Sequence, residues 1–472
     1  YSSAASDVYK RQKVYGDIHL FSLYNHLMNM MEITAQMREN KKIEFKAQLK
    51  IVILLSVPAI LEQLVGTAMS YIDTAMVGSL GYKATAAIGV VASTTWLFGG
   101  ICTAAVLGFS VQVAQYLGAG KNKLARQVVC QSILFNIIFG LCMASVVVAS
   151  SFYLPKLLGA DPSICRDATL YLAIVGAFIP FNMMAMLHSG MLRCSGNAVL
   201  PSLMNISMCV FDVIFNYFFI YILNLGVAGA ALGTGMAQLV VGFILMYIVV
   251  KKEKSLRLLG DESWKFNKAI LKNVVNLSIP AGLERVTLSL AQVVMTGVVS
   301  GMGAISVAIN YVAVSAEGLC YLPAYGIGGA ATTLVGQSIG ANRKDMAKRF
   351  AYLTTLLSFV LVIFMSVIMF VFAPFLASTL TNSQEVINGA SECLRIVSFS
   401  EPLFAISIVV MGALRGAGDS KRPFVLNALS MWGMRVLPII IFTKRYGVIG
   451  VWATMTFELV FRGIIFLSLI HI

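Results

Sequence analysis

Seven acidic side chains interrupt long apolar stretches of this 472-residue chain, and their chemistry is the first feature to explain. They are Glu62, Asp73, Asp212, Glu284, Glu317, Glu401 and Glu458. A charge at the centre of a lipid bilayer costs about 2.5–3.5 kcal/mol on insertion scales, so such residues usually face a cavity and bind ions or polar substrates.

Asp73 is the strongest candidate for binding a coupling cation. It lies in an otherwise apolar segment beside Tyr71 and Thr74. A carboxylate held away from water can bind a proton or Na⁺ and exchange it for an organic cation. Because the two ligands exclude each other, binding of one drives release of the other. We therefore expect H⁺ or Na⁺ at Asp73, with Tyr71 and Gln63 nearby as substrate contacts.

A second candidate group is Asp212 with Asn216. The two residues are four apart in an apolar segment, so a helix places them on one face. We expect them to take part in cation coupling together with Asp73.

Glu62 and Glu284 each follow a proline by four residues, Pro58 and Pro280. Proline frees carbonyl groups and can bend a helix. The two acids could line a substrate cleft or anchor the bent helices, and Glu284 could instead pair with Arg285. The substrate-binding role is the prediction that we carry forward.

Glu317 and Glu401 are candidates for binding an organic cation. Glu317 has Tyr311 and Tyr321 near it in the sequence, and Glu401 precedes Pro402. An acid beside aromatic rings suits a cation through charge and cation–π attraction. The alternative is hydrogen bonding within the helix bundle.

Other polar groups in apolar segments are expected to be structural. Glu458 and Arg435 can pair with each other, and a lone His188 cannot form a metal site. Gly120-Lys121 is no phosphate loop, because the required Gly and Ser or Thr are absent around it. We expect no cofactor, no certain metal site and no enzymatic activity.

Composition identifies the element that must position these residues. Hydrophobic residues make up 58% and charged residues 12% of the chain, with a mean hydropathy of +0.83. Soluble domains have about 25% charged residues. The recurring apolar runs reach the length of about 20 residues that a helix needs to cross a bilayer. The sequence predicts an all-α integral membrane protein with twelve spans near 51–77, 88–117, 127–152, 168–192, 199–223, 227–250, 274–300, 306–338, 350–376, 393–414, 424–443 and 447–468.

An internal duplication relates the two halves of the chain. Three motifs recur with one constant shift in numbering, which takes position 56 to position 278, and we call this shift the repeat offset. A fourth motif recurs with a shift that is shorter by one position. The pairs are 56–62 with 278–284, 115–119 with 337–341, 192–196 with 414–418, and 226–229 with 447–450. Six helices per half place both halves in the same orientation, so we expect two pseudo-symmetric six-helix lobes with a site between them.

The domain organisation follows from this repeat. We expect an N-terminal cytoplasmic segment at 1–48, an N-lobe at 49–250, a cytoplasmic linker at 251–272 and a C-lobe at 273–472. Residues 1–12 and 468–472 look like non-native sequence, which leaves the true ends of the chain open.

The formal charge of +14 is a topology signal. One side of the membrane collects Arg38, Lys41, Lys42, Lys46, Lys50, Lys121, Lys123, Arg126, Arg193, the 251–272 stretch, Arg343, Lys344, Lys348, Arg349, Arg415, Lys421 and Arg422. The other side has Lys83, Lys156, Arg166, Arg395, Lys444 and Arg445. The side rich in lysine and arginine is expected to be cytoplasmic. We therefore expect a multi-pass protein of the cell (inner) membrane with both termini in the cytoplasm. The distribution argues against nucleic-acid binding.

With these motifs placed, the chain resembles the multidrug and toxic compound extrusion (MATE) transporters from about 49 to 467. The motifs that carry the resemblance are Asp73-Thr74-Ala-Met-Val77-Gly78, Gly118-Ala119-Gly120-Lys121, Leu225-Gly226-Val227-Ala-Gly229-Ala230-Ala231, Gly340-Ala341-Asn342-Arg343 and Leu414-Arg415-Gly416-Ala-Gly418-Asp419. The resemblance implies a V-shaped arrangement of two lobes. It also implies export of organic, often cationic, compounds in exchange for H⁺ or Na⁺.

The resemblance bears on individual residues as well. It implies a cation-coupling aspartate at Asp73. Some relatives have Asn and then Asp where this chain has Asp212 and then Asn216, so the coupling role of Asp212 stays open. The alternative function within the same superfamily is a lipid-linked oligosaccharide flippase, although the acidic residues favour cationic substrates. We expect the partners to be a small organic molecule and the lipid bilayer, with the chain acting as a monomer.

Overall fold

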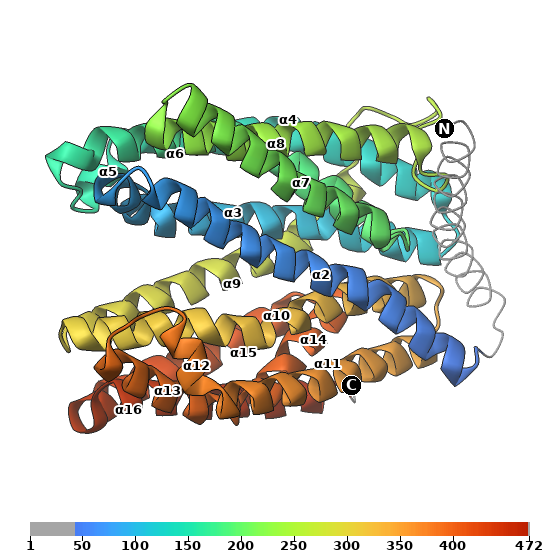
Figure 1. Ribbon diagram of the computed structural model, residues 1–472. Helices are drawn as coiled ribbons and strands as arrows, with labels where there is room; N and C mark the ends of the chain where they lie inside the picture. The colour runs from blue at the N-terminus through green and yellow to red at the C-terminus, as the bar shows by residue number, and fades with distance from the viewer. Residues whose placement is uncertain (1–42, 471–472) are drawn as a thin grey trace, which may run out of the picture.

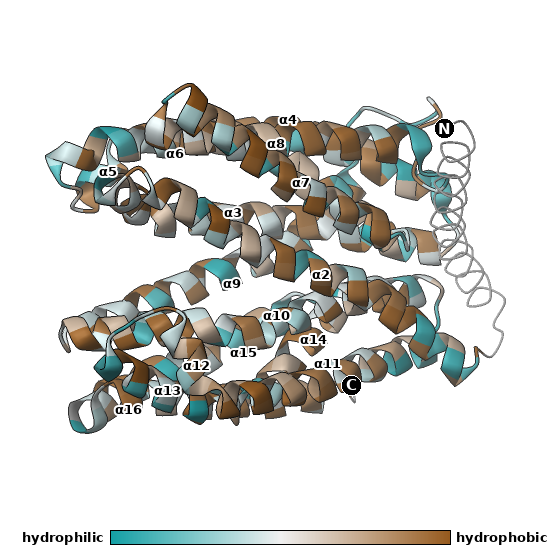
Figure 2. Cartoon of the chain, viewed as in Figure 1, coloured by the Kyte–Doolittle hydropathy of each residue, from teal (hydrophilic) through white to brown (hydrophobic). Residues whose placement is uncertain are grey.

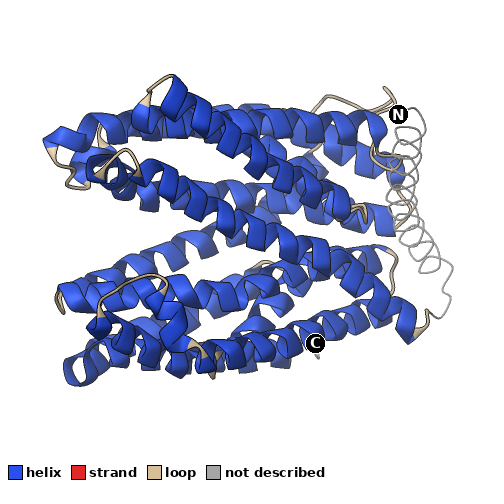
Figure 3. Cartoon of the chain, in the orientation of Figure 1, coloured by secondary structure: helices blue, strands red, loops and turns tan. Residues whose placement is uncertain are grey.

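The computed structural model describes residues 43–470, which are almost entirely helical and contain no β-strand (Figure 1, Figure 3). The first half contains α2 (Phe45–Gly78), α3 (Tyr82–Gly118), α4 (Asn122–Ser151), α5 (Leu154–Leu157), α6 (Pro162–Cys194), α7 (Val199–Tyr217), η1 (Phe218–Ile222), α8 (Gly226–Tyr247) and η2 (Ile248–Lys252). The second half contains α9 (Lys268–Ser300), α10 (Ala304–Gly340), α11 (Lys344–Val371), α12 (Ala373–Ser378), α13 (Gln384–Ser398), α14 (Glu401–Ala417), α15 (Lys421–Leu429), η3 (Ser430–Val436) and α16 (Leu437–Leu469). Arg38, Lys41 and Lys42 of the expected basic side lie outside the described residues.

The membrane-spanning helices agree with the expected number. Within residues 43–470, eleven helices are long and apolar enough to cross a bilayer, and α13 with α14 forms a twelfth span bent by 58°. Figure 2 shows apolar residues along most of the length of these helices. The all-α membrane fold is therefore confirmed.

The bend in the tenth span lies next to a proline, but the proline alone does not explain it. Pro402 at the start of α14 cannot donate a backbone hydrogen bond, and it disfavours helical geometry in the residue before it. Its repeat partner, Pro180, lies inside the continuous helix α6. The bend makes Glu401 the first residue of α14, where the helix dipole favours a negative charge.

The duplication is visible in backbone geometry as well as in sequence. Gly81 and Gly303, which are separated by the repeat offset, precede α3 and α10 with φ angles of 102° and 100°. A side chain at either position would be strained in this left-handed region. The two halves therefore repeat the same turn at the same place.

The two halves form two lobes, α2–α8 and α9–α16, and each contains a large apolar core, of which the first extends to Ile270 and Val274 of α9. They meet where α2 packs against α10 and α3 packs against α9. In Figure 1 the lobes lie close together toward the ends of α3 and α10, and α2 and α9 draw apart toward the opposite end. The pairing of α2 with α10 and of α3 with α9 follows the internal repeat.

A symmetric pair of glutamines joins the lobes. The Gln115 amide in α3 donates to the Gly416 carbonyl across the interface, with an N···O distance of 3.0 Å. The Gln337 amide in α10 donates to the Cys194 carbonyl at 2.9 Å. Gln337 is the repeat equivalent of Gln115, and Gly416 is that of Cys194, so each bond is the symmetry mate of the other. We call these two bonds the glutamine latch.

Glycines let the backbones approach closely at the latch. A Cβ atom at Gly118 would overlap the backbone of Gln337, and one at Gly340 would overlap the backbone of Gln115. Only a residue without a side chain can sit at these two helix ends while the lobes are joined. The interface is therefore closed by backbone contact here.

The segment between the lobes is attached to α4. The Arg126 guanidinium bonds to Glu262 at 2.7 Å, and the Gln131 amide donates to the Lys265 carbonyl at 2.8 Å. The Asn267 backbone N–H donates in turn to the Gln131 side-chain oxygen at 2.8 Å. These bonds fix the linker to the N-lobe.

A matched set of glycine substitutions tests the close contact at the latch. We expect Gly118→Ala and Gly340→Ala to lower thermal stability in detergent, since overpacking costs about 1–3 kcal/mol. Gly329→Ala in α10 is the control, because a Cβ atom there meets nothing within 4 Å. Equal melting temperatures for all three variants would contradict the contact.

Candidate cation and substrate sites

Asp73 in α2 and Asn216 in α7 are hydrogen-bonded across two neighbouring helices. The Asn216 amide donates to a carboxylate oxygen of Asp73 at 3.0 Å. Asn216 is 1% exposed, and a Cβ atom at Gly233 in α8 would overlap its side chain. The missing side chain at Gly233 thus makes room for the amide that holds Asp73.

Asp212 completes this group from one turn earlier in α7. Its side chain lies within reach of the Asp73 carboxyl group and the Thr234 hydroxyl. Among the described residues, however, neither Asp212 carboxylate oxygen has a hydrogen bond of good geometry. Asp212 is 3% exposed, so water does not satisfy it freely. The structure therefore brings Asp73, Asp212 and Asn216 together, and we call them the N-lobe acidic cluster.

The electrostatics of this cluster favour cation uptake. Two carboxylates that face each other in an apolar bundle repel strongly when both are ionised, because the low dielectric screens them poorly. A proton or a cation between them removes the repulsion and occupies the unsatisfied oxygens of Asp212. The NH2 group of Asn216 donates to one oxygen of Asp73, which orients that carboxyl group.

Tyr71 and Gln63 lie apart from this cluster. Tyr71 is two residues before Asp73, so it points to a different face of α2, and it is 47% exposed. Gln63 is ten residues before Asp73, roughly 15 Å along the helix axis. Their proposed substrate contacts stay predictions.

Glu62 lies in a polar cluster inside the N-lobe. The Arg193 guanidinium donates to both of its carboxylate oxygens at 2.8 Å, and the Asn205 amide donates to one of them at 2.8 Å. The Ser202 hydroxyl adds a bond of 3.2 Å. These partners come from α6 and α7 and hold Glu62 against its own lobe.

The C-lobe repeats this cluster at the same repeat offset. The Arg415 guanidinium donates to Glu284 at 2.8 Å, and the Asn427 amide donates to it at 2.9 Å. Glu284 does not pair with its neighbour Arg285, whose side chain instead packs beside Gly100. This geometry favours the second of the two roles considered for Glu62 and Glu284, that of structural anchors, and their substrate-binding role stays a prediction.

The internal repeat carries a signal for these partners. Arg193 and Arg415 lie in the repeated motifs, and Asn205 and Asn427 are separated by the same repeat offset. The two arginines were expected among the loop charges of the cytoplasmic side. They lie in the last turns of α6 and α14 and turn inward to reach the acids.

A different charged network fills the centre of the C-lobe. The Arg435 guanidinium donates to one oxygen of Glu458, with its shorter bond at 2.6 Å. The Arg462 Nε and the Ser430 hydroxyl donate to the other oxygen at 2.7 and 2.5 Å. The expected pairing of Glu458 with Arg435 is thus present. Ser430 and Arg435 are five residues apart in the π-helical segment η3, so one π turn aims both at Glu458.

Glu317 in α10 and Glu401 in α14 face each other beside this network. Their carboxyl groups are close enough for one to donate to the other when protonated. Glu401 is fully buried, and neither of its oxygens has a partner of good geometry among the described residues. The structure brings these two predicted residues together in a second acidic pair.

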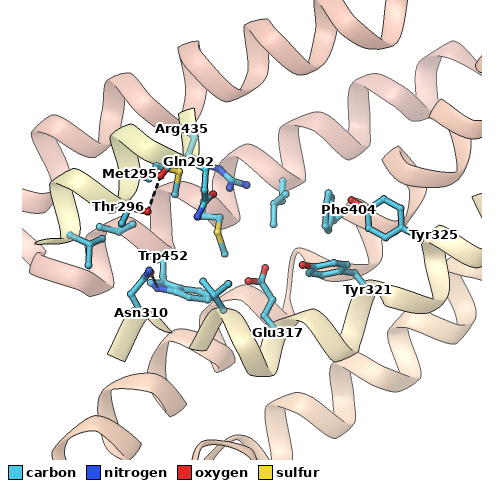
Figure 4. Close-up of a pocket in the computed structure, with 15 residues that line it drawn as sticks. Gln292, Met295, Thr296, Asn310, Glu317, Tyr321, Tyr325, Phe404, Arg435 and Trp452 are labelled. Carbon is cyan, nitrogen blue, oxygen red and sulfur yellow. Dashed lines mark hydrogen bonds between the residues drawn. The ribbon is translucent and has the colours of Figure 1, made fainter. Parts of the chain in front are cut away.

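Glu317 and Arg435 line a cavity of about 150 Å³ inside the C-lobe. Its walls come from α9, α10, α14, η3 and α16, and Figure 4 shows Glu317, Tyr321 and Trp452 along one side of it with Arg435 and Gln292 on the other. Met295, the repeat partner of Asp73, also lines it. At the position equivalent to Asp73, the C-lobe therefore has an apolar side chain in the cavity wall.

No cluster of three or more His, Cys, Asp or Glu side chains suited to a metal ion occurs between residues 43 and 470. His188 is buried, and its ring is hydrogen-bonded to the Met184 carbonyl at 2.7 Å. The two acidic pairs are thus the candidate cation sites in the described structure.

Comparison with known proteins gives the family. The MatE family model matches residues 58–218 and matches again at residues 280–441. The chain belongs to the MatE family. The starts of the two MatE matches, at positions 58 and 280, differ by the repeat offset that relates the lobes.

Similar proteins extend this result. A probable multidrug resistance protein NorM of Thermotoga maritima is 26% identical over 424 residues, covering 88% of this MatE chain and 90% of that protein. The uncharacterized transporter YisQ of Bacillus subtilis is 26% identical over 403 residues, covering 84% and 88%. A MATE family multidrug resistance transporter solved in an outward-facing conformation has a TM-score of 0.85 at 22% identity, covering 90% of this chain and 95% of that one. The expected family is confirmed, and these named relatives are transporters.

Charge-removing substitutions test the anchoring role of Glu284. We expect Glu284→Gln to lower the melting temperature strongly, because breaking a buried ion pair costs about 3–5 kcal/mol. Glu62→Gln should cost less, since the side chain of Glu62 is 13% exposed and that of Glu284 is 3%. Thermal unfolding of the purified variants measures both effects.

Two further variants complete this test. Glu284→Leu combined with Arg415→Met should recover much of the loss, because no charge is left without a partner. Glu392→Gln, at an exposed site, is the matched control. If Glu284→Gln unfolds like wild type but no longer binds substrate, the anchoring role is wrong.

Proposed function

We propose that this protein is a secondary active transporter that exports organic compounds, chiefly amphipathic cations, in exchange for H⁺ or Na⁺. The family supports the transport role. The observation that carries the coupling role is the N-lobe acidic cluster, in which Asn216 fixes Asp73 beside the unsatisfied carboxylate of Asp212.

Coupling in this cluster arises from competition for negative charge. When a proton or Na⁺ occupies the pair, the lobe has little attraction for an organic cation. When the ion leaves, the repulsion between Asp73 and Asp212 is relieved by a bound organic cation instead. Each ligand thus binds the site better without the other, which is the differential affinity that antiport needs.

The interface between the lobes supports movement between two states. The latch consists of two neutral hydrogen bonds, each worth about 0.5–1.5 kcal/mol net. A transition driven by ion binding can break both bonds, because typical coupling free energies are about 1–3 kcal/mol. The two bonds of the latch are related by the internal repeat. The lobes can therefore rotate apart about the repeat axis as rigid bodies, without new contacts within either lobe.

We propose further that the protein lies in the cell (inner) membrane with both termini in the cytoplasm. The lysines and arginines of the loops after α3 and α10 and of the 251–272 linker support this orientation. The latch would then close the cytoplasmic side. Each candidate site lies within one chain, which supports a monomer as the working unit.

Transport assays in everted vesicles test the coupling site. Ethidium uptake is measured with a pH gradient and a Na⁺ gradient imposed separately. We expect one gradient to drive uptake by the wild type and Asp73→Asn to reduce that rate by about tenfold or more, which corresponds to a barrier higher by ~1.4 kcal/mol. Asp212→Asn should also reduce it, because the pair then holds less negative charge.

The matched control for this assay is Asp345→Asn, which makes the same chemical change at an exposed carboxylate. Its transport rate should equal that of the wild type. Normal ion-driven uptake by Asp73→Asn would remove Asp73 from the mechanism. Absence of uptake under both gradients would remove antiport of this cation altogether.

A further inference from the structure

We propose that the C-lobe cavity is a binding site for a small zwitterion with an apolar body, in which Glu317 binds the cationic group and Arg435 binds the carboxylate. The inference rests on the proposed transport function and names a second substrate class for it. It depends on charges and shape inside one lobe, so it is independent of the N-lobe acidic cluster.

The size of the cavity limits the ligand. A cavity of about 150 Å³ is similar in volume to an engineered protein cavity that holds benzene. A molecule of amino-acid size, with one small apolar group and two charged groups, matches this volume, which is smaller than a large amphipathic drug.

The charges around the cavity favour a ligand that is neutral overall but has two poles. Glu458 lies between Arg435 and Arg462, and this trio has a net charge of +1. Glu317 and Glu401 face each other, and two facing carboxyl groups in an apolar site hold one proton between them, which leaves a net charge of −1. The two parts balance, so a zwitterion adds no net charge to the apolar lobe. A simple cation would be repelled by the positive trio, and a simple anion would be repelled by the negative Glu317–Glu401 pair.

Arg435 has donors left for a carboxylate. Its bonds to Glu458 use Nε and Nη2. Within the part of the chain that the structure describes, its Nη1 has no hydrogen-bond acceptor. The Gln292 amide lines the cavity near it (Figure 4). A guanidinium and an amide together suit the two oxygens of a carboxylate.

Glu317 lies on the other side of the cavity, and aromatic rings flank it. The Tyr321 ring packs edge-on against Phe404 with centroids 5.3 Å apart. The Trp452 indole donates to Asn310 at 3.2 Å, which fixes its ring in the cavity wall. A carboxylate beside fixed aromatic faces binds an ammonium group, and the rings contact the apolar body.

The internal repeat separates function from folding at this site. The N-lobe positions equivalent to Glu317 and Glu401 at the repeat offset are Thr95 and Ile179. Near the end of each lobe the shift is shorter by one position, and there Glu458 and Arg462 correspond to Ala237 and Val241. The N-lobe folds in the same way without any of these charges. The repeated fold therefore does not by itself require Glu317 and Glu401, and we assign their charge to a ligand, whereas Glu458 is paired with Arg435 and Arg462.

A ligand series on the purified full-length protein tests the proposal by isothermal titration calorimetry. The zwitterions are L-leucine and 6-aminohexanoate, which are isomers with different separations between their charges. L-leucinamide keeps only the cation, and N-acetyl-L-leucine keeps only the anion. We expect at least one zwitterion to bind about tenfold or more tightly than both single-charge analogues, a difference of ~1.4 kcal/mol.

Two variants locate the binding. Glu317→Gln should weaken binding of the better zwitterion by about tenfold, whereas Glu385→Gln, at an exposed site on α13, should not change it. Arg435→Lys keeps the positive charge but loses the forked donor, so it should weaken the zwitterion more than L-leucinamide. Size-exclusion profiles and thermal unfolding confirm that each variant is folded.

The contradicting results are specific. Binding of neither zwitterion, or binding of L-leucinamide as tight as both, overturns the proposal, as does an unchanged affinity in Glu317→Gln. Ethidium uptake by vesicles with the same wild-type protein separates this failure from failure of the proposed function. Ion-driven uptake without zwitterion binding removes only the C-lobe site.

Discussion

A charge inside an apolar helix bundle must be paired, neutralised or held for a ligand, and this constraint organises the structure. Glu62 and Glu284 satisfy it by pairing, each with one arginine and one asparagine. Glu458 satisfies it with two arginines and a serine. Asp73 with Asp212 and Glu317 with Glu401 are left as acid facing acid. A cation or a polar ligand that binds at either of these two pairs relieves the repulsion between the acids.

The internal repeat shows which polar groups maintain the fold and which differ between the lobes. The Glu–Arg–Asn anchors and the glutamine latch occur twice at the same offset, as do the turns at Gly81 and Gly303. The acidic pairs do not: Asp73 corresponds to Met295, and Glu317 corresponds to Thr95. Duplication thus supplied one scaffold with two chemically different interiors. In our proposals one interior couples an ion and the other binds a polar substrate.

The connection between the lobes combines close approach with weak bonds. At Gly118 and Gly340 the backbones touch, so the contact is selective for glycine. The two bonds of the latch are neutral: the Gln115 amide donates to the Gly416 carbonyl and the Gln337 amide donates to the Cys194 carbonyl. A joint of this kind orients two rigid lobes without fixing them permanently. The linker adds a tether on one side, where it binds α4 through Arg126 and Gln131.

The sequence by itself determined the helical membrane fold, the number of spans and the duplication. Apolar runs of bilayer length favour helices that satisfy their own backbone groups, and the offset between repeated motifs can be read directly from the chain. It also singled out Asp73, Asp212 and Asn216, because an acid in an apolar run is conspicuous. Only the tertiary structure decided how these groups combine. The arginine partners of Glu62 and Glu284 are 131 residues away along the chain, and Glu317 lies on a different helix from Glu401, which it faces.

The physical reason is that spacing along one helix fixes which residues share a face, but not which helix covers that face. That is why Asp212 and Asn216 could be grouped in advance, whereas the repeat offset relates Arg193 to Arg415 without saying which acid each arginine meets. Packing between helices also gives similar acidic residues different roles. An acid that lies beside an arginine of the next helix forms an ion pair that anchors the helices, and an acid that lies beside another acid forms a candidate cation site.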